Sequence, residues 1–218
     1  MDILFQDESI IAVNKPSGIL TIRDGYNPDL PTVKSLLELD FGRCWIVHRL
    51  DKETSGILLV ARNETAHRSL NLAFENHQIR KIYHALIFGF PKNKEFIIDF
   101  PLRIDGDRRH RTIVDFDQGK PAKSKITILN IFQDCCLAEI RPETGYTHQI
   151  RSHLASIGHP ILGDRLYKKT NTNPSEVIAR TALHAYQITF IHPTTHSTVT
   201  ISARYPNDFL DTLEKLAK

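Results

Sequence analysis

Several kinds of residue and segment are scarce in this 218-residue sequence, and each shortage excludes a class of protein. The three cysteines, Cys44, Cys135 and Cys136, are too few and too poorly spaced for a disulfide framework, so we expect reduced thiols. The longest apolar runs, such as residues 57–61, fall far short of the ~18 residues typical of a membrane span. The chain does not begin with a basic and apolar leader. We therefore expect a cytoplasmic protein that has no membrane partner.

The net charge of the chain is also small. Lys+Arg of 28 against Asp+Glu of 25 gives a net charge of only +3, so any contact with nucleic acid must come from local basic patches. There are eleven histidines, but none is arranged as His-Glu-x-x-His and no Cys-x-x-Cys occurs. Glycine-rich loops that bind nucleotide phosphates are also missing. The sequence therefore predicts neither a metal site nor an organic cofactor, and a metal hydrolase is a weak rival interpretation.

The composition that remains is that of a compact globular protein, with 41% hydrophobic and 24% charged residues. Its length fits a single catalytic domain over residues 1–218. Short apolar runs bounded by turn residues predict strands over 3–5, 10–13, 57–61, 83–90, 96–102, 126–132, 137–140, 185–191 and 198–203.

Helices are fewer. We expect them over residues 32–40, over 64–77 behind a capping Asn63, and from Asn207 to the end of the chain. Another follows a capping Thr147, carries Ile150, Leu154 and Ile157 on one stripe, and stops at Gly158. Strands and helices do not alternate regularly, so the pattern favours an α+β fold with a large mixed, mostly antiparallel sheet and flanking helices.

A charged block stands between two apolar runs near residue 50. If the chain is extended there, Arg49 and Asp51 project to the same face, because side chains alternate along an extended segment. The two side chains could then pair or address one ligand. The alternative interpretation is a solvated turn between two core strands.

A second polar cluster, residues 144–153, lies at the start of the third expected helix. His148 and Arg151 are three residues apart, which makes them neighbours on a helix face distinct from the apolar stripe. A guanidinium at Arg151 close to Asp51 would hold the carboxylate ionised and fix its orientation, and such an aspartate suits attack on carbon. The alternative is a helix whose polar face meets water.

Tyr83 is a third candidate, because it shares a strand face with Lys81 and Ala85. A tyrosine that faces a cleft could stack on a base or move a proton. One that faces the core would only fill volume.

Together, these segments resemble one family, the RluA-type pseudouridine synthases. The matching motifs are Asn-Lys-Pro-x-Gly at 14–18, His-Arg-Leu-Asp at 48–51, Lys-x-Tyr at 81–83, Thr-Gly-x-Thr-His-Gln-Ile-Arg at 144–151 and Gly-His-Pro-Ile-Leu-Gly-Asp at 158–164. Their order and approximate spacing both match, and the resemblance covers nearly the whole chain.

The resemblance implies the pseudouridine synthase fold, a mixed sheet of two half-domains with a central basic cleft, and isomerisation of uridine in ribosomal or transfer RNA. It implies that Asp51 is the catalytic aspartate, that Arg151 pairs with it, and that Tyr83 packs on the base and is a candidate proton-transfer group. Arg49 would fill the stack when the uridine is flipped out. The further candidates for binding substrate are His48 and His148. Isomerisation adds no atom and changes no oxidation state, which agrees with the absence of a predicted cofactor.

Two departures from the family pattern bear on RNA binding. Tyr146 stands where the family usually has Arg, and only 50 residues precede Asp51, so the chain looks like the short members without an additional N-terminal RNA-binding domain. Basic segments must then hold the RNA. The candidates for phosphate contact are Arg108, Arg109 and Arg111, with lysines 120, 123 and 125 behind them. The alternative for these residues is a solvated loop.

A noncatalytic RNA-binding or RNA-folding module with the same cleft is the rival function from a different class. The intact Asp51 and Arg151 favour the enzyme. We expect a monomer that acts on a structured RNA stem-loop. The choice of uridine depends on loop shape and contacts to flanking bases, which no motif encodes.

Overall fold

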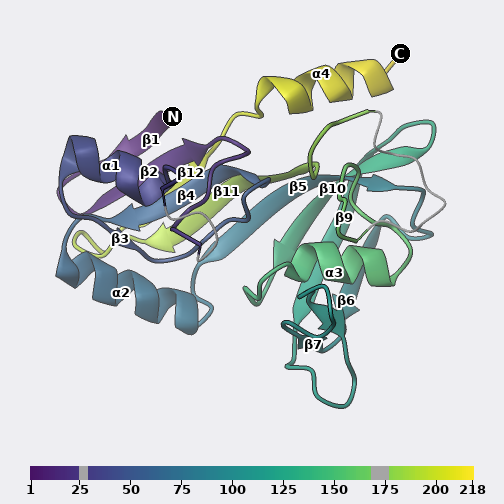
Figure 1. The fold of residues 1–218 in the computed structure, drawn as a ribbon, viewed down its shortest axis with the longest axis horizontal. Coiled ribbons are helices and arrows are strands. Elements are labelled where there is room, and N and C mark those ends of the chain that lie inside the picture. Colours follow the sequence, from purple (N-terminus) through teal and green to yellow (C-terminus); the bar gives the residue numbers. More distant parts are fainter. Residues whose placement is uncertain (25–28, 168–176) are drawn as a thin grey trace. The chain divides into compact units, whose positions relative to one another are not determined.

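The computed structural model describes residues 1–24, 29–167 and 177–218. The chain divides into two compact units (Figure 1). Unit 1 comprises residues 1–81 and 185–205, and unit 2 comprises residues 82–184 and 206–218. Two units are what the expected half-domains require. In the part of the chain that the structure describes, no helix is long and apolar enough to cross a membrane.

Unit 1 is built on antiparallel strands that closely match the predicted apolar runs. Its strands are β1 (Asp2–Gln6), β2 (Ile10–Lys15), β3 (Trp45–Ile46), β4 (Ser55–Ala61), β11 (Leu183–Ile191, of which the first two residues belong to unit 2) and β12 (Thr198–Ser202). β2 pairs with β1 and β4, β3 pairs with β4, and β11 pairs with β12. Every residue of β4 is buried, as expected for a strand that reads as a continuous apolar run.

The helices of unit 1 begin at capping residues, Asn63 as predicted and Thr32, which was expected to be the first residue of its helix. In α1 (Val33–Phe41) the Thr32 hydroxyl accepts from the Ser35 N–H, and the Ser35 side chain accepts from the Thr32 N–H. In α2 (Glu64–Glu75) the Asn63 side chain accepts from the Ala66 N–H. The apolar face of α2 joins the core cluster that contains Ile57, Leu59 and Phe190.

Unit 2 also contains an antiparallel sheet. Its strands, in order across the sheet, are β5 (Arg80–Phe88, of which the first two residues belong to unit 1), β10 (Cys135–Pro142), β9 (Lys123–Ile131) and β6 (Glu95–Asp99). A small separate pair is formed by β7 (Leu102–Arg103) and β8 (Ile113–Val114), and the helices are α3 (Gln149–Ser156) and α4 (Asn207–Leu216). The prediction of an α+β fold on antiparallel sheet is confirmed.

Two local predictions were wrong. The strand expected over 96–102 is broken, because β6 ends at Asp99 and Pro101, which has no N–H to give to a sheet, precedes β7. The helix expected to be capped by Thr147 starts one residue later, because His148 is left-handed (φ 55°) and is itself the N-cap. The Thr147 carbonyl instead accepts a hydrogen bond from the Thr112 hydroxyl at 2.6 Å.

α3 is buried on every side over its first six residues, Gln149 to Leu154, so the interpretation of a water-facing polar side is also wrong. The polar side chains of α3 take part in a series of hydrogen bonds in which the donor and acceptor of each bond can be assigned. The Gln149 amide donates to the Ser124 hydroxyl (3.1 Å), which lies 3.0 Å from Nδ1 of His153. Because the Phe100 carbonyl can only accept, Nε2 of His153 is the nitrogen that donates to it, at 3.0 Å, and Ser124 therefore donates to Nδ1. Burial lowers the pKa of His153, which agrees with this neutral ring.

A fully buried lysine fixes the loop that carries Asp51. Lys15 has 0% exposure, and its ammonium donates to the carbonyls of Pro16 (2.9 Å), Ile19 (2.8 Å) and Lys52 (3.2 Å). The Lys52 carbonyl also accepts from the Gly18 N–H, at 2.8 Å. The Lys15 ammonium therefore connects the turn at residues 14–18 to Lys52, the residue after Asp51.

His48 and Thr21 hold the same segment from its other end. Nε2 of His48 accepts from the Leu59 N–H of β4 at 2.9 Å, and the ring stacks on Phe74 at 4.7 Å. The Thr21 hydroxyl donates to the Leu50 carbonyl and accepts from the Leu50 N–H. Nε2 of His48 thus serves the fold, and only its Nδ1 could address a substrate.

Gly56 follows the loop, at the start of β4, and its backbone requires glycine. Its φ is 109°, and a Cβ at this position would lie 2.2 Å from the Ala185 carbonyl oxygen of β11. A side chain would therefore push β4 and β11 apart.

The cysteines agree with the expectation of reduced thiols. All three are buried and free. Burial raises the pKa of Cys44 and Cys135 to about 11 and that of Cys136 to about 12, so these thiols stay protonated and unreactive at neutral pH.

The role of Lys15 can be tested by Lys15→Met, which keeps the length of the side chain and removes its charge. Three carbonyl oxygens lose a buried donor, so we expect the free energy of unfolding to fall by about 2–4 kcal/mol. Urea denaturation measures the change. The control, Lys34→Met on the exposed side of α1, should cost less than about 0.5 kcal/mol. Equal losses in the two variants would contradict the role given to Lys15.

His48 should make the protein sensitive to acid. Burial, and then the charge of Lys81, lowers its pKa from 6.5 to about 3. Between these values the unfolded chain binds a proton that the folded protein does not, so the stability from neutral His48 is present above pH 6.5 and is lost as the pH falls towards 3. Each pH unit in that window costs up to about 1.4 kcal/mol.

We therefore expect the free energy of unfolding to fall less steeply below pH 6.5 in His48→Gln than in the wild type. Glutamine keeps an acceptor for Leu59. His84 and His153, whose pKa values burial also lowers, leave part of the slope in place. The exposed control His77→Asn should retain the full slope. A wild-type slope in His48→Gln would disprove the prediction.

Candidate functional site

The residues predicted for the site are divided between the two units. His48, Arg49 and Asp51 belong to unit 1, and unit 2 contains Tyr83, His148 and Arg151 together with the arginines of the 103–111 segment. Each unit positions its own group by local contacts, which we describe in turn.

In unit 1, Arg49 is exposed, Leu50 is buried and Asp51 is half-buried. This alternation is that of an extended segment, so Arg49 and Asp51 lie on the side away from the core. The Asp51 carbonyl accepts from the Thr54 N–H at 3.1 Å, which closes the turn into β4. Asp51 is thus an aspartate in a loop whose backbone is fixed on both sides, by Thr21 and by Lys15.

In unit 2, Arg151 forms a buried bidentate ion pair with Asp164. Nε of Arg151 donates to Oδ2 at 2.7 Å and Nη2 donates to Oδ1 at 2.9 Å. The Asp164 side chain is completely buried, and that of Arg151 is 10% exposed. Oδ1 of Asp164 also accepts from the N–H groups of Leu166 (2.9 Å) and Tyr167 (3.1 Å). Asp164 therefore fixes the plane of the guanidinium.

From the sequence we expect Asp51 as the partner of Arg151, and no motif points to a role for Asp164. The pairing with Asp51 stays a prediction, since Asp51 belongs to the other unit. The ion pair with Asp164 uses Nε and Nη2 of Arg151. The signal that could have found Asp164 is a single acid after Gly163, in an otherwise apolar part of the last motif.

Tyr167 connects Arg151 to the basic segment, and sequence reasoning missed it altogether. Cζ of Arg151 lies 5.1 Å from the centre of the Tyr167 ring, and Cζ of Arg111 lies 5.8 Å from it. The phenol oxygen contacts both backbone groups of Thr112, the N–H at 2.9 Å and the carbonyl at 3.0 Å. The Tyr167 ring is therefore in contact with two guanidinium groups. Its hydroxyl fixes Thr112, the residue that follows the basic segment.

The same hydroxyl fixes the tautomer of His148. Nδ1 of His148 lies 3.3 Å from the Tyr167 oxygen. The single phenol proton is needed for the Thr112 carbonyl, which can only accept, so the hydroxyl has only a lone pair for His148. Nδ1 of His148 must then carry hydrogen. In the neutral ring, Nε2 is then the nitrogen that can accept a hydrogen bond.

The arginines of the 103–111 segment differ in their availability. Arg103 contacts Asp115 at 3.1 Å, and Arg111 donates to Asp107 through Nε at 2.7 Å and to the Leu166 carbonyl. These two side chains hold the segment together. Arg108 and Arg109 are exposed, and no ion pair of theirs is found among the described residues. They are thus the arginines of this segment best placed to meet phosphates.

The lysines behind this segment are less available. Lys123 and Lys125 form exposed ion pairs with Glu143 and Glu95, each at 3.5 Å, while Lys120 is exposed. Tyr83 is half-buried on β5, opposite Ile140 of β10. His192 and His196 lie in the turn between β11 and β12. Over residues 1–24, 29–167 and 177–218, no group of His, Cys, Asp and Glu is placed to hold a metal ion.

Relatives of known name match almost the whole chain. It is 35% identical over 208 residues to the dual-specificity RNA pseudouridine synthase RluA of Salmonella typhimurium, covering 95% of this chain and 93% of the relative. It is 37% identical to the ribosomal large subunit pseudouridine synthase D of Zymomonas mobilis, covering 95% of this chain and 70% of that protein.

Solved structures show the same fold. Human RNA pseudouridylate synthase domain containing 1 superposes with a TM-score of 0.79 at 26% identity, covering 94% of this chain and 83% of the human chain. The family model described as RNA pseudouridylate synthase matches residues 9–156. The match includes Asp51, Tyr83 and Arg151. The chain belongs to the RNA pseudouridylate synthase family and is an RNA pseudouridine synthase of the RluA type.

Proposed function

We propose that this chain converts specific uridines of ribosomal or transfer RNA, or both, to pseudouridine, with Asp51 as the catalytic carboxylate acting on a flipped-out uridine. The observation that carries the proposal is the placement of Asp51. It is a half-buried carboxylate in a loop fixed by Lys15 and Thr21, in a chain of this family. Of the two named relatives, one is a dual-specificity RNA pseudouridine synthase and the other is a pseudouridine synthase of the ribosomal large subunit.

The reaction is an isomerisation, and its balance needs only side chains. The bond between N1 of uracil and C1′ of ribose breaks, the uracil turns, and C5 bonds to C1′. C5 then loses its proton and N1 gains one, so no atom or electron is added overall. A carboxylate can act as the nucleophile or as a stabilising charge in this reaction. A closed site keeps the detached uracil from water.

The residues of unit 2 have supporting roles in this proposal. Arg151, whose guanidinium is oriented by Asp164 and Tyr167, would pair with the Asp51 carboxylate and fix its orientation. Tyr83 would pack on the flipped base and is the candidate for proton transfer at C5. His148 would contact the RNA, while Arg49 would fill the place that the uridine leaves.

The basic segment supplies the grip on RNA in this proposal. Arg108 and Arg109 would contact phosphates, which fix the register of the RNA without reading its sequence. Arg111, which is held by Asp107, would contribute by shaping the segment. We infer that the protein acts as a monomer, in the cytoplasm, on a structured stem-loop.

Asp51→Asn tests the catalytic assignment directly. Asparagine keeps the size of the side chain but cannot act as a charged nucleophile or stabiliser, so we expect the rate of pseudouridine formation to fall by about 10³-fold or more. RNA affinity should stay within about 3-fold, a change below 1 kcal/mol. Pseudouridine is measured by mass spectrometry of a digested RNA stem-loop, and affinity is measured by filter binding.

The control for this experiment is Asp211→Asn, which removes an exposed carboxylate from α4 and should leave turnover unchanged. Turnover by a purified Asp51→Asn protein would contradict the assignment. If the wild type binds RNA tightly but forms no pseudouridine in any cellular RNA, the rival function, a noncatalytic RNA-binding or RNA-folding module, is the correct one.

The basic segment is tested by Arg108→Gln combined with Arg109→Gln. Each phosphate contact contributes roughly −0.7 to −0.9 to the slope of log affinity against log salt, so the slope should flatten by about 1–2. The loss of affinity should be similar for different RNA sequences, and turnover at saturating RNA should survive much better than affinity. The control, Lys215→Gln with Lys218→Gln, removes the same charge from the C-terminal segment. A double arginine variant that behaves like this control would show that the segment is solvated surface.

A further inference from the structure

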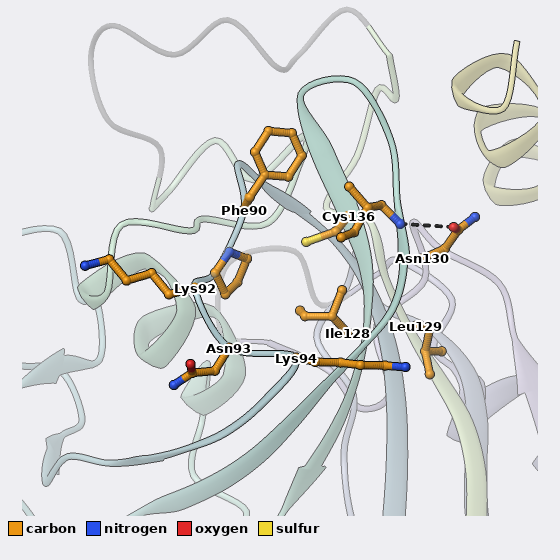
Figure 2. Close-up of a pocket in the computed structure, with 10 residues that line it drawn as sticks. Phe90, Lys92, Asn93, Lys94, Ile128, Leu129, Asn130 and Cys136 are labelled. Carbon is orange, nitrogen blue, oxygen red and sulfur yellow. Dashed lines mark hydrogen bonds between the residues drawn. The ribbon is translucent and has the colours of Figure 1, made fainter.

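Unit 2 has a pocket of about 440 Å³ whose lining includes none of the candidate site residues. It lies where the loop after β5 faces the end of β9, and we call it the edge pocket. The residues that give it its character are Phe90, Lys92, Lys94, Leu129, Asn130 and Ile131. Figure 2 shows Phe90, Lys92, Asn93 and Lys94 of the loop together with Ile128 and Leu129 of β9.

A β-bulge turns apolar side chains into this pocket. In the pairing of β9 with β10, Asn130 is opposite Leu137 and Ile128 is opposite Ala138, so Leu129 is an extra residue without a partner. A regular strand would bury every second side chain, but Leu129, Asn130 and Ile131 are all exposed, the two apolar ones by 45% and 65%. Bulges often re-aim side chains next to functional positions.

The loop opposite the bulge adds an aromatic ring and positive charge. Phe90 is 49% exposed. Lys92 and Lys94 are exposed, no Asp or Glu lines the pocket, and neither lysine forms an ion pair with any described residue. By contrast, Lys123 and Lys125 on the same sheet are paired with glutamates. The edge pocket therefore combines apolar surface with uncompensated positive charge, which suits a ligand that is both planar and anionic.

Asn130 provides a polar group of fixed orientation at the edge pocket. Its Oδ1 accepts from the N–H of Ile131 at 3.0 Å, the hydrogen bond drawn in Figure 2. The amide is thus oriented with Nδ2 as its donor group. Asn93, which also lines the pocket, supplies a second amide. Amide groups beside an exposed ring are the means by which proteins read the edge of an unstacked base.

We propose that the edge pocket binds one single-stranded nucleotide of the RNA, outside the uridine that reacts. The base stacks on Phe90 over Leu129 and Ile131, and the neighbouring phosphates contact Lys92 and Lys94. A volume of about 440 Å³ lies within the range of small-ligand pockets and suits one nucleotide. The proposal rests on the proposed function only in taking RNA as the ligand.

The test uses the full chain and an oligoadenylate of eight nucleotides as probe, because RNA without uridine separates binding from turnover. Methyl NMR should show shifts at Leu129 and Ile131 on titration with the probe. Phe90→Ala should weaken binding by about 5- to 20-fold, the lower part of the range for one stacked base, and Phe90→Tyr should restore it. Lys92→Gln with Lys94→Gln should flatten the salt slope by about 1.4 for two contacts with single-stranded RNA.

Two controls match these variants. Leu72→Ala truncates another exposed apolar side chain, on α2 of unit 1, and the double variant of Lys215 and Lys218 removes the same charge. The proposal is overturned if the methyl groups do not shift and the pocket variants bind RNA like the controls. It is also overturned if the pocket variants only reduce self-association in sedimentation, since a second copy of the chain would then be the ligand. Turnover by Asp51→Asn would refute the catalytic assignment without touching this result.

Discussion

The ion pair between Arg151 and Asp164 is the contact on which the candidate site of unit 2 depends. Asp164 has no exposed side-chain surface, and a buried carboxylate is costly unless it is paired and hydrogen-bonded. Arg151 supplies two charged hydrogen bonds, and the N–H groups of Leu166 and Tyr167 supply two more. Such a pair is weak support for stability in itself, but it sets geometry. With both groups satisfied, the guanidinium has one permitted orientation, and the backbone at Tyr167 is fixed with it.

Tyr167 connects this buried ion pair to the exposed basic segment of unit 2. Its ring packs against Arg151 and Arg111, while its hydroxyl binds both backbone groups of Thr112 and sets the tautomer of His148. A buried network of this kind is rigid only when every member is satisfied. The segment proposed to hold phosphates and the arginine proposed to hold the catalytic carboxylate therefore share one support, which gives bound RNA a physical route to affect the reactive group.

The sequence was a good guide wherever structure follows a local pattern. The alternating and apolar runs located most of the strands, and the capping side chain of Asn63 marked the start of α2. The predictions that failed concern segments whose structure depends on contacts with residues distant in the chain. α3 starts late because Thr112, 35 residues away, takes the Thr147 carbonyl, and the two-residue strands β3, β7 and β8 are too short to show a period.

The same distinction separates the candidate site residues that were found from those that were missed. Asp51, Arg151 and Tyr83 stand in recognisable motifs. Tyr167 acts through a residue 55 positions away, and Lys15 reaches across 37 positions to the Lys52 carbonyl. A lysine in a turn is normally solvated, so nothing local in the sequence predicts that this one has 0% exposure.

Both units solve the problem of holding reactive side chains in the same way, by burying a charge among groups that fix it. In unit 1 the charge is the ammonium of Lys15, bound by three carbonyls around the loop of Asp51. In unit 2 it is the carboxylate of Asp164, which orients Arg151. Arg49, Arg108 and Arg109 are by contrast exposed, and long exposed side chains keep their rotamer freedom until a ligand orders them. The groups proposed for chemistry are thus ordered before RNA arrives. Those proposed to grip the RNA become ordered only on binding, so the entropic cost of order falls on affinity and leaves the chemical step unaffected.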